Sequence, residues 1–333
     1  MKKQVGAFMA AALILASLTA CSGNGSANNA KTSEELKWPD STIQIILPYS
    51  AGGDSDTNCR IAAQYLEKEL GVTVVCVNNP GSNSTLGPIA VLDAKEDGNT
   101  LYYYNSAQAT NQATGIFKDA GFDMFDDFVA AGTCAYDGSY ALVCPADRGW
   151  KTLDDMVADA KAAPESISFS YSYGTNVHYL AIGLEESLGI DLDEIDIGSD
   201  NAEKIVALLS GEVDLITGNL STFEDYLEDG SMVCLGLFAQ ERSEYYPDIP
   251  TLSEYGVAAI CPKYYEFRFK KGTDERIVQK FNEALMKVCA DPEYQKELAT
   301  YRASAICLTP QEQEEFDKSY VNDQYEALKD YIN

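Results

Sequence analysis

Short β-rich runs alternate with helical runs between Ile43 and Asn105, and this alternation restricts the fold more than any other feature of the chain. The first helical run ends at Gly71 after apolar residues at helical spacing, and the second opens on Pro88. Repeated strand–helix–strand units predict an α/β fold with parallel strands and right-handed crossovers. Ligands of such sheets bind beyond the carboxyl ends of the strands. The strand-like runs are TIQIILPY (42–49), VTVVCV (72–77) and TLYYYN (100–105).

A second α/β unit follows Asp126. The run FVAAGTCAYDGSYALVCP (128–145) predicts two strands around Asp137-Gly138, and helical and strand-like runs alternate as far as residue 239. A strand-like segment from about Cys261 leads into the C-terminal helices. A chain that crosses more than once between two α/β units is typical of a hinged, cleft-forming binding protein. We expect one domain from residues 38–140 and 262–333, and a second from residues 141–261.

The N-terminus has the pattern of an export signal that ends at a lipidated cysteine. Two lysines precede an apolar run that is too short and too rich in small residues to span a membrane. The run ends in LTAC (18–21), which resembles the lipobox of bacterial lipoproteins and implies cleavage before Cys21 and diacylation of its sulfur. We expect residues 1–20 to be a signal peptide and residues 21–37 a polar tether. The lipid on Cys21 would anchor the exported protein to the bilayer, at the outer face of the cell membrane.

The composition excludes some partners and leaves the state of the cysteines open. A formal charge of −28 argues against nucleic acid, whose phosphates an acidic surface repels. Eight cysteines follow Cys21, an even number that an exported chain can pair, and buried free thiols are an equal alternative. We hypothesise that Cys134 and Cys144, which flank the turn at Asp137-Gly138, form a disulfide across a hairpin. With one histidine and no CxxC spacing, neither a metal site nor a cofactor is expected.

Seven stretches, in order along nearly the whole mature chain, match one family. The chain resembles the solute receptors of the tripartite tricarboxylate transporters, also called Bug receptors. The resemblance implies a type II periplasmic-binding fold, with two α/β domains around a ligand cleft. It also implies capture of a small carboxylate and its delivery to the large and small membrane subunits of an ion-driven permease. The stretches are WPDSTIQIILPYSAGGDSD (38–56), LGVTVVCVNNPGSNSTLG (70–87), EDGNTLYYY (96–104), GTNVHYLA (174–181), LLSGEVDLITGNL (208–220), ERSEYYPDIPTLSEYGV (241–257) and KKGTDERIVQKFNEAL (270–285).

Two stretches depart from the family pattern. Its second loop usually reads Pro-Gly-Ala-Gly-Gly, whereas residues 80–84 read PGSNS. Fewer glycines and more polar side chains predict a narrower loop with more hydrogen bonds, in which Asn83 can adopt a left-handed backbone. The family's Tyr-Lys-Gly stretch is replaced by DIGSDN (196–201), which leaves open whether this segment contacts ligand and whether the ligand is a usual one.

The glycine-rich turn AGGDSD (51–56) predicts an anion site at a helix start. It has no lysine after its glycines and no GxGxxG pattern, which argues against nucleotide phosphate. Backbone N–H groups at a helix start bind an anion without a basic side chain. Asp56 is interpreted as a cap of its own helix rather than as a ligand contact. Residues 81–85 and 174–176 precede two more helices, and three such starts around one cleft would suit a dicarboxylate.

The remaining polar and aromatic candidates are assigned mainly structural roles. No GxSxG motif or second metal ligand accompanies His178, so a structural or cleft-lining role is favoured over catalysis. Tyr102–Tyr104 and Tyr264–Tyr265 are expected in the core, with one of each able to face the cleft, and Asp214 is expected near it. The expected ligand-binding residues are Tyr49, Ala51, Gly52, Gly53, Asp56, Gly81, Ser82, Asn83, Ser84, Ser106, Gly174, Thr175, Asn176, His178 and Asn219.

A lipid-anchored receptor, rather than an enzyme, is the function that these features favour. Two alternatives remain open. One is a sensor that presents its ligand to a signalling kinase. The other is an exported hydrolase on the same scaffold, which would need a nucleophile, a base and an oxyanion site in one pocket.

Overall fold

A six-stranded sheet in the order β11-β4-β10-β3-β1-β2 carries the predicted strand–helix alternation. The computed structural model describes residues 36–198 and 200–332, so the signal peptide, Cys21 and nearly all of the tether lie outside the described residues. β1 pairs in parallel with both β2 and β3, as predicted, and α1 (Asp54–Leu70) and α2 (Leu86–Leu92) form the crossovers. The strands are β1 (Ile43–Leu47), β2 (Val74–Asn78), β3 (Thr100–Asn105), β4 (Phe128–Asp137), β10 (Lys263–Lys270) and β11 (Ser304–Ala305).

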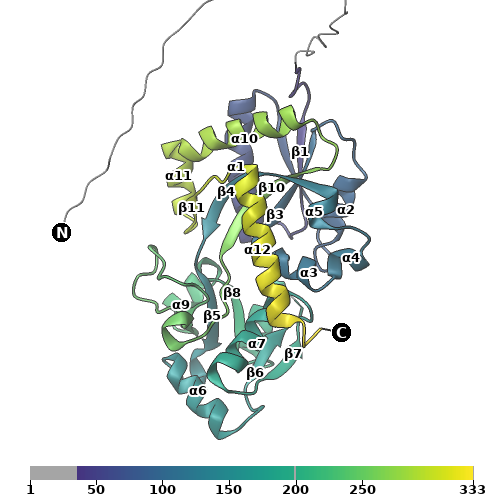
Figure 1. Ribbon diagram of the computed structural model, residues 1–333. Coiled ribbons are helices and arrows are strands. Elements are labelled where there is room, and N and C mark those ends of the chain that lie inside the picture. The colour runs from purple at the N-terminus through teal and green to yellow at the C-terminus, as the bar shows by residue number, and fades with distance from the viewer. Residues whose placement is uncertain (1–35, 199, 333) are drawn as a thin grey trace, which may run out of the picture. The chain divides into compact units, whose positions relative to one another are not determined.

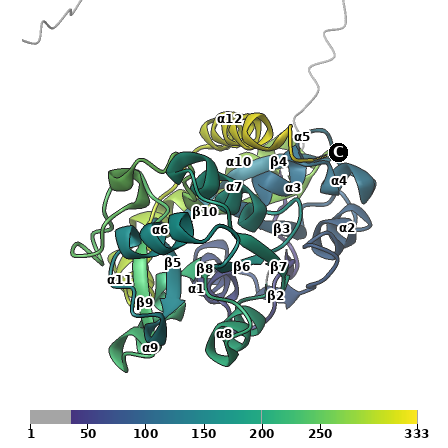
Figure 2. The ribbon, with the colours of Figure 1, turned by 90° about the horizontal axis from the view of Figure 1, so that it is seen from below.

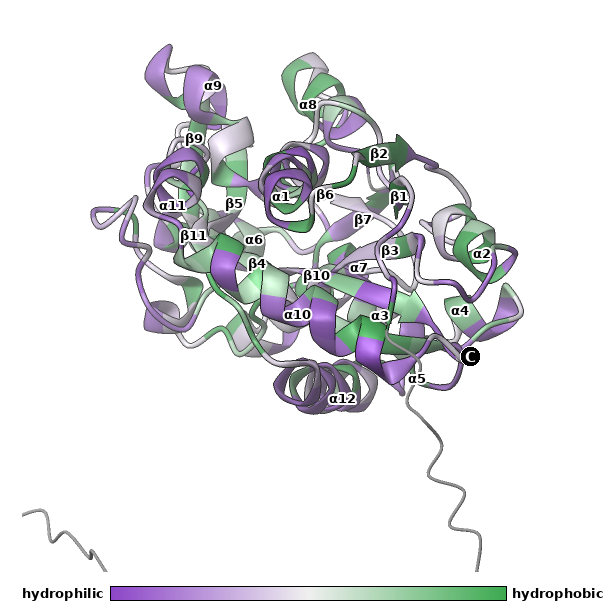
Figure 3. Cartoon of the chain, turned by 90° about the horizontal axis from the view of Figure 1, so that it is seen from above, coloured by the Kyte–Doolittle hydropathy of each residue, from purple (hydrophilic) through white to green (hydrophobic). Residues whose placement is uncertain are grey.

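The C-terminal segment completes this sheet and covers it. β10 runs antiparallel between β3 and β4, which places the end of the chain next to its beginning. In α10 (Glu275–Ala290), the residues at helical spacing, Phe281 among them, pack on the phenylalanines of β10, and its outer side is hydrophilic (Figure 3). α11 (Pro292–Ala299) follows. α12 (Pro310–Leu328) then runs along β4 towards α3 and α7 (Figures 1 and 2).

A second group of strands follows β4. β5 (Tyr140–Pro145) lies between β8 (Ile216–Asn219) and β9 (Met232–Leu237), and β6 (Ser168–Tyr171) pairs with β7 (Asp193–Asp196). The helices around these strands are α6 (Leu153–Ala162), α7 (Asn176–Leu188), α8 (Asn201–Ser210) and α9 (Glu224–Glu228). Three short helices, α3 (Ala109–Ala113), α4 (Ile116–Asp119) and α5 (Met124–Asp127), connect β3 to β4. The short 3₁₀ turns are η1 (Ser106–Gln108), η2 (Ala146–Arg148), η3 (Leu220–Thr222) and η4 (Leu252–Tyr255).

The predicted hairpin around Asp137-Gly138 is wrong. β4 pairs with β10 and β11, whereas β5 pairs with β8 and β9, so the segment between them carries the chain from one sheet to the next. The carboxylate of Asp137 accepts the N–H of Ser139 at 2.8 Å within this segment. Cys134 and Cys144 are free thiols in separate hydrophobic clusters. The hypothesis of a disulfide between them is therefore also wrong, because their strands never face each other.

Arg268 anchors α12 to the sheet from inside the protein. Its side chain is fully buried on β10 and donates to the equally buried carboxylate of Asp317 on α12. Glu266, two residues earlier on β10, accepts from Gln313 on α12 at 2.9 Å. Burial raises the pKa of Glu266 well above its usual value. These polar contacts, together with apolar packing, hold the last helix in place.

No helix between residues 36 and 332 combines the length and the apolar character needed to cross a membrane.

Candidate functional site

A pocket of about 500 Å³ lies beyond the carboxyl ends of β1, β2 and β3, where the parallel topology predicts a ligand. Its opposite wall comes from the start of α7 and the start of α8. Of the expected ligand residues, those that line it are Tyr49, Gly53, Gly81, Asn83, Ser84, Thr175 and Asn176. Those outside the lining are Ala51, Gly52, Asp56, Ser82, Ser106, Gly174, His178 and Asn219.

The first pocket loop differs from the prediction in which residue begins the helix. α1 begins at Asp54, and its N-cap is Gly53, so the expectation that Asp56 caps the helix is wrong. Asp56 lies in the first turn and accepts the N–H of Gly52 at 2.9 Å and the amide of Asn78 at 2.9 Å. Its carboxylate thus ties the glycine turn to β2. The positive φ of this turn, 86°, belongs to Gly52, whereas Gly53 has an ordinary φ of −77°.

The second pocket loop is a left-handed turn built largely without glycine. Ser82, Asn83 and Ser84 have φ values of 48°, 52° and 66°, and Gly81 before them has 118°. The prediction for Asn83 holds, but both serines adopt the same conformation, which costs an L-residue about 1–2 kcal/mol. The turn is held by Asn111, which donates to the carbonyl of Asn83 at 2.8 Å. Backbone strain of this kind gathers at functional sites.

The third expected loop places His178 behind the pocket. The Nδ1 atom of His178 accepts the N–H of Gly174 at 3.1 Å, and the ring packs on Tyr171 and Tyr173. Burial lowers the pKa of His178, which favours the neutral ring that can accept this bond. The histidine therefore shapes the turn before α7, while Thr175 reaches the pocket.

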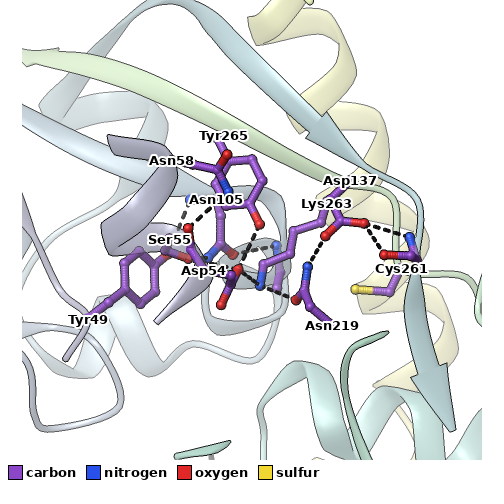
Figure 4. Close-up of polar contacts among 12 residues, drawn as sticks. Tyr49, Asp54, Ser55, Asn58, Asn105, Asp137, Asn219, Cys261, Lys263 and Tyr265 are labelled. Carbon is purple, nitrogen blue, oxygen red and sulfur yellow. Dashed lines mark hydrogen bonds and ion pairs between the residues drawn. The ribbon is translucent and has the colours of Figure 1, made fainter. Parts of the chain in front are cut away.

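An ion pair between Asp54 and Lys263 lies in the pocket wall (Figure 4). The ammonium of Lys263 donates to Asp54 Oδ2 at 2.5 Å and to Asn219 Oδ1 at 2.7 Å, and the hydroxyl of Tyr265 donates to the same Oδ2 at 2.7 Å. Asn219 in turn donates to the buried carboxylate of Asp137. Burial alone would raise the pKa of Asp54, but the charge and hydrogen bond of Lys263 and the hydroxyl of Tyr265 outweigh it and lower that pKa.

Neutral amides form much of the remaining wall. They include Asn105, Gln108, Asn111 and Asn176, which come from the end of β3, the segment after it and the start of α7. Gln108 Nε2 and Asn176 Oδ1 are buried and have no hydrogen-bond partner among the described residues. A buried polar atom without a partner is costly, and a bound ligand is one way to satisfy it.

The start of α8, which includes the last two residues of the segment that departs from the family pattern, contributes to the pocket wall. Asp200, Asn201 and Glu203 line it, and Asp200 caps α8 by accepting the N–H of Ala202 at 2.9 Å. Beneath this helix start, Lys204 is buried, and its Nζ donates to the carbonyl of Thr217 at 2.6 Å. Burial lowers the pKa of Lys204 to about 8.

Several pocket residues were missed or misplaced from sequence. Lys263 is the first residue of β10, a strand that also carries Glu266, Arg268 and Lys270, so its own sequence context gave no distinctive signal. The polar run after β3 lies at a strand's carboxyl end and carried a usable one. Of the tyrosine runs, Tyr102–Tyr104 are fully buried and outside the lining, and Tyr265 reaches the ion pair. Asp214 is also outside the lining, because its carboxylate accepts the N–H of Ser168 at 2.9 Å.

No three His, Cys, Asp or Glu side chains within residues 36–198 and 200–332 are grouped so that they could hold a metal ion.

Residues 59–331 match the model of the tripartite tricarboxylate transporter family receptor. The chain belongs to this receptor family. It is 28% identical over 286 residues to a UPF0065 protein in the gbd 5′ region of Cupriavidus necator, with 84% of each chain covered. It is also 25% identical over 276 residues to protein BugT of Bordetella pertussis, with 82% of this chain and 84% of BugT covered.

Three solved structures with the same fold are a periplasmic binding protein and two proteins that hold a small carboxylate. BugD superposes with a TM-score of 0.76 at 23% identity, over 88% of this chain and 98% of that one. MatC from Rhodopseudomonas palustris with bound malate gives 0.76 at 20% identity, over 87% and 100%. An R. palustris protein with adipate gives 0.79 at 19% identity, over 88% and 97%. The predicted two-domain periplasmic-binding fold is thus confirmed, and the family receptor is a solute-binding protein.

Proposed function

We propose that this receptor captures a small organic carboxylate in the pocket and delivers it to the large and small membrane subunits of a tripartite permease. The observation that carries the proposal is the pocket itself, where the start of α1, the left-handed turn at 81–84 and the start of α7 face one another. The malate and adipate held by two proteins of the same fold support a carboxylate as the class of ligand.

The pocket suits a carboxylate for a physical reason. The N-termini of α1 and α7 carry partial positive charge, each contributing on the order of 0.3–1 kcal/mol to an anion. The buried amide donor of Gln108 adds a neutral hydrogen bond. The hydrolase alternative lacks comparable support, because the chain's single histidine is buried and already accepts a backbone N–H.

Domain closure and anchoring belong to the same proposal. Residues 38–140 with 262–333, and residues 141–261, would act as two domains that close on the ligand. The chain passes between its two sets of strands near Ser139 and again near Cys261. Export and attachment through a lipid on Cys21 rest on the lipobox resemblance, and a receptor held at the membrane would meet its permease more often.

Ligand retention tests the proposed function. A protein comprising residues 36–333 would be purified gently, and its bound small molecules would be identified by mass spectrometry. Calorimetry with each candidate would follow. A small carboxylate that binds stoichiometrically is expected. A retained ligand without any carboxylate would contradict the proposal, and normal uptake in cells lacking the permease subunits would favour the sensor alternative instead.

A further inference from the structure

We propose that the preferred ligand is a zwitterion, a carboxylate that also carries a protonated amine, and that Asp54 selects it by binding the ammonium. This inference rests on the proposed function, because it specifies which carboxylates the same pocket accepts. It starts from a contradiction in the pocket: a site built to hold an anion has a carboxylate of its own in its wall.

The side-chain hydrogen bonds of Asp54 all converge on one of its oxygens, and the backbone N–H of Ser55 also contacts the carboxylate. The hydrogen bonds from Lys263, Tyr265 and Ser55 all reach Oδ2, at 2.5, 2.7 and 3.4 Å. No side chain among the described residues donates to Oδ1. Because Lys263 keeps the pKa of this carboxyl below its usual value, Asp54 is ionised at neutral pH. An ionised oxygen in a pocket wall attracts an ammonium and repels a carboxylate.

Lys263 is the other half of the same recognition element. An ammonium has three N–H donors, and two of them are used, by Asp54 and by Asn219 at 2.7 Å. The third has no acceptor within residues 36–198 and 200–332, and the lysine lines the pocket. A ligand with both signs of charge would place its ammonium against Asp54 and its carboxylate against Lys263 or the helix starts.

Two buried amide side chains in the pocket wall offer an acceptor and a donor that suit the two charged groups of a zwitterion. Asn176 Oδ1 is an acceptor without a partner, and Gln108 Nε2 is a donor without one. Both side chains are more than nine-tenths buried and line the pocket. An ammonium supplies the donor that Asn176 needs, and a carboxylate supplies the acceptor that Gln108 needs. A ligand with only carboxylates would satisfy Gln108 Nε2 but would offer no donor to Asn176 Oδ1 or to Asp54 Oδ1.

The charges around the pocket point the same way. Asp54, Asp200 and Glu203 line it, against Lys263 as the lining cation. Lys204 in the first turn of α8 is buried and donates to a backbone carbonyl at 2.6 Å, and it is not among the lining residues. A wall with more acidic than basic side chains disfavours a dianion and accommodates a zwitterion.

Matched pairs of probes test the inference without relying on any variant. L-aspartate and succinate differ by one ammonium, as do L-glutamate and glutarate and L-alanine and propionate. Thermal shift would screen a panel of such pairs, and calorimetry would measure those that respond. In at least one pair, the amino acid is expected to bind at least ten-fold more tightly than its partner. Tighter binding of the deaminated acid in every responding pair would overturn the inference and leave the proposed function standing. No response from either set would contradict both.

The variant Asp54→Asn then assigns the selectivity to one carboxylate. This variant is expected to lower the affinity for the amino acid at least ten-fold. Its affinity for the deaminated acid should stay unchanged or increase, because Lys263 is released from its ion pair with residue 54. Asp225→Asn removes the same charge from an exposed position on α9, outside the pocket lining, and is expected to leave both affinities unchanged. Equal weakening of both probes in Asp54→Asn would mean that Asp54 only supports the pocket, and would overturn its role in selection.

Discussion

Lys263 Nζ lies 2.5 Å from Asp54 Oδ2, across 209 positions of the chain. This contact joins the first residue of α1 to the first residue of β10. Asp54 alone would weaken the anion site at the helix start, since a carboxylate there occupies the place of the ligand. Paired with Lys263, Asp54 supplies one of two opposite charges that lie side by side in the pocket wall. The receptor's specificity is therefore expected to depend on a contact between two segments that lie 209 positions apart in the chain.

Substitutions of the two glycines in the first pocket loop are expected to have different effects. Gly52 has a φ of 86° and open space around it, so Gly52→Ala should cost about 1–2 kcal/mol of stability through backbone strain. Gly53 has an ordinary backbone but lines the pocket, so Gly53→Val should lower affinity for the strongest carboxylate ligand at least ten-fold and retain the fold. Calorimetry and urea denaturation of both variants measure the two effects. If Gly53→Val binds like the wild type, this loop does not contact the ligand.

Asp56 is expected to stabilise the folded state through its charge and to affect affinity little. Burial alone would raise its pKa, but hydrogen bonds from Arg60, Gly52 and Asn78 outweigh this and lower it. A lowered folded-state pKa stabilises the protein above the unfolded value of about 3.9, and this contribution is lost as the pH falls through the folded value. Asp56→Asn should thus cost about 1.5 kcal/mol at neutral pH.

The pH dependence of the free energy of unfolding tests whether the charge of Asp56 carries this contribution. Urea denaturation between about pH 6 and pH 3 should show the difference between the wild type and Asp56→Asn shrinking on the acid side of the unfolded pKa. A difference that stays constant over this range would mean that the hydrogen-bonding shape of Asp56, rather than its charge, carries the effect.

The left-handed turn is expected to gain stability from glycine. Ser84 has a φ of 66°, so Ser84→Gly should raise the free energy of unfolding by about 1 kcal/mol through relief of strain. Thr85 has a φ of −89° and donates to the carbonyl of Ser82 at 2.8 Å, so Thr85→Gly should destabilise the protein and serves as the control. Equal effects of the two substitutions in urea denaturation would exclude strain at Ser84.

Oxidation is expected to pair Cys59 with Cys76. Their sulfur atoms lie 3.5 Å apart between α1 and β2, whereas Cys134 and Cys144 lie in separate clusters. Treatment with a diazene oxidant removes two protons and two electrons from the thiol pair and reduces the oxidant to a hydrazine. Peptide mapping without reduction should find the Cys59–Cys76 link, and Cys76→Ser should abolish it. A link between Cys134 and Cys144 would contradict the sheet arrangement described above.

Local patterns determined the elements and the place of the pocket. The runs at 42–49, 72–77 and 100–105 predicted three strands, and the helical spacing between them dictated parallel pairing. Parallel pairing places the ends of β1, β2 and β3 at one edge, so Tyr49, Gly53 and the turn at 81–84 were found from sequence. These inferences hold because periodicity and crossover handedness depend on neighbours within some thirty residues.

The charges and partners in the pocket were decided only by the tertiary structure. Nothing in AGGDSD distinguishes Asp54, which lines the pocket, from Asp56, which binds Gly52 and Asn78 outside its lining. α1 is capped by Gly53 rather than by Asp56, and this offset of three residues turns one carboxylate towards Lys263 and the other towards β2. The turn at Asp137-Gly138 has the composition of a hairpin, yet its strands join different sheets. In each case the local residues are compatible with either arrangement, so contacts between segments far apart in the chain decide which one forms.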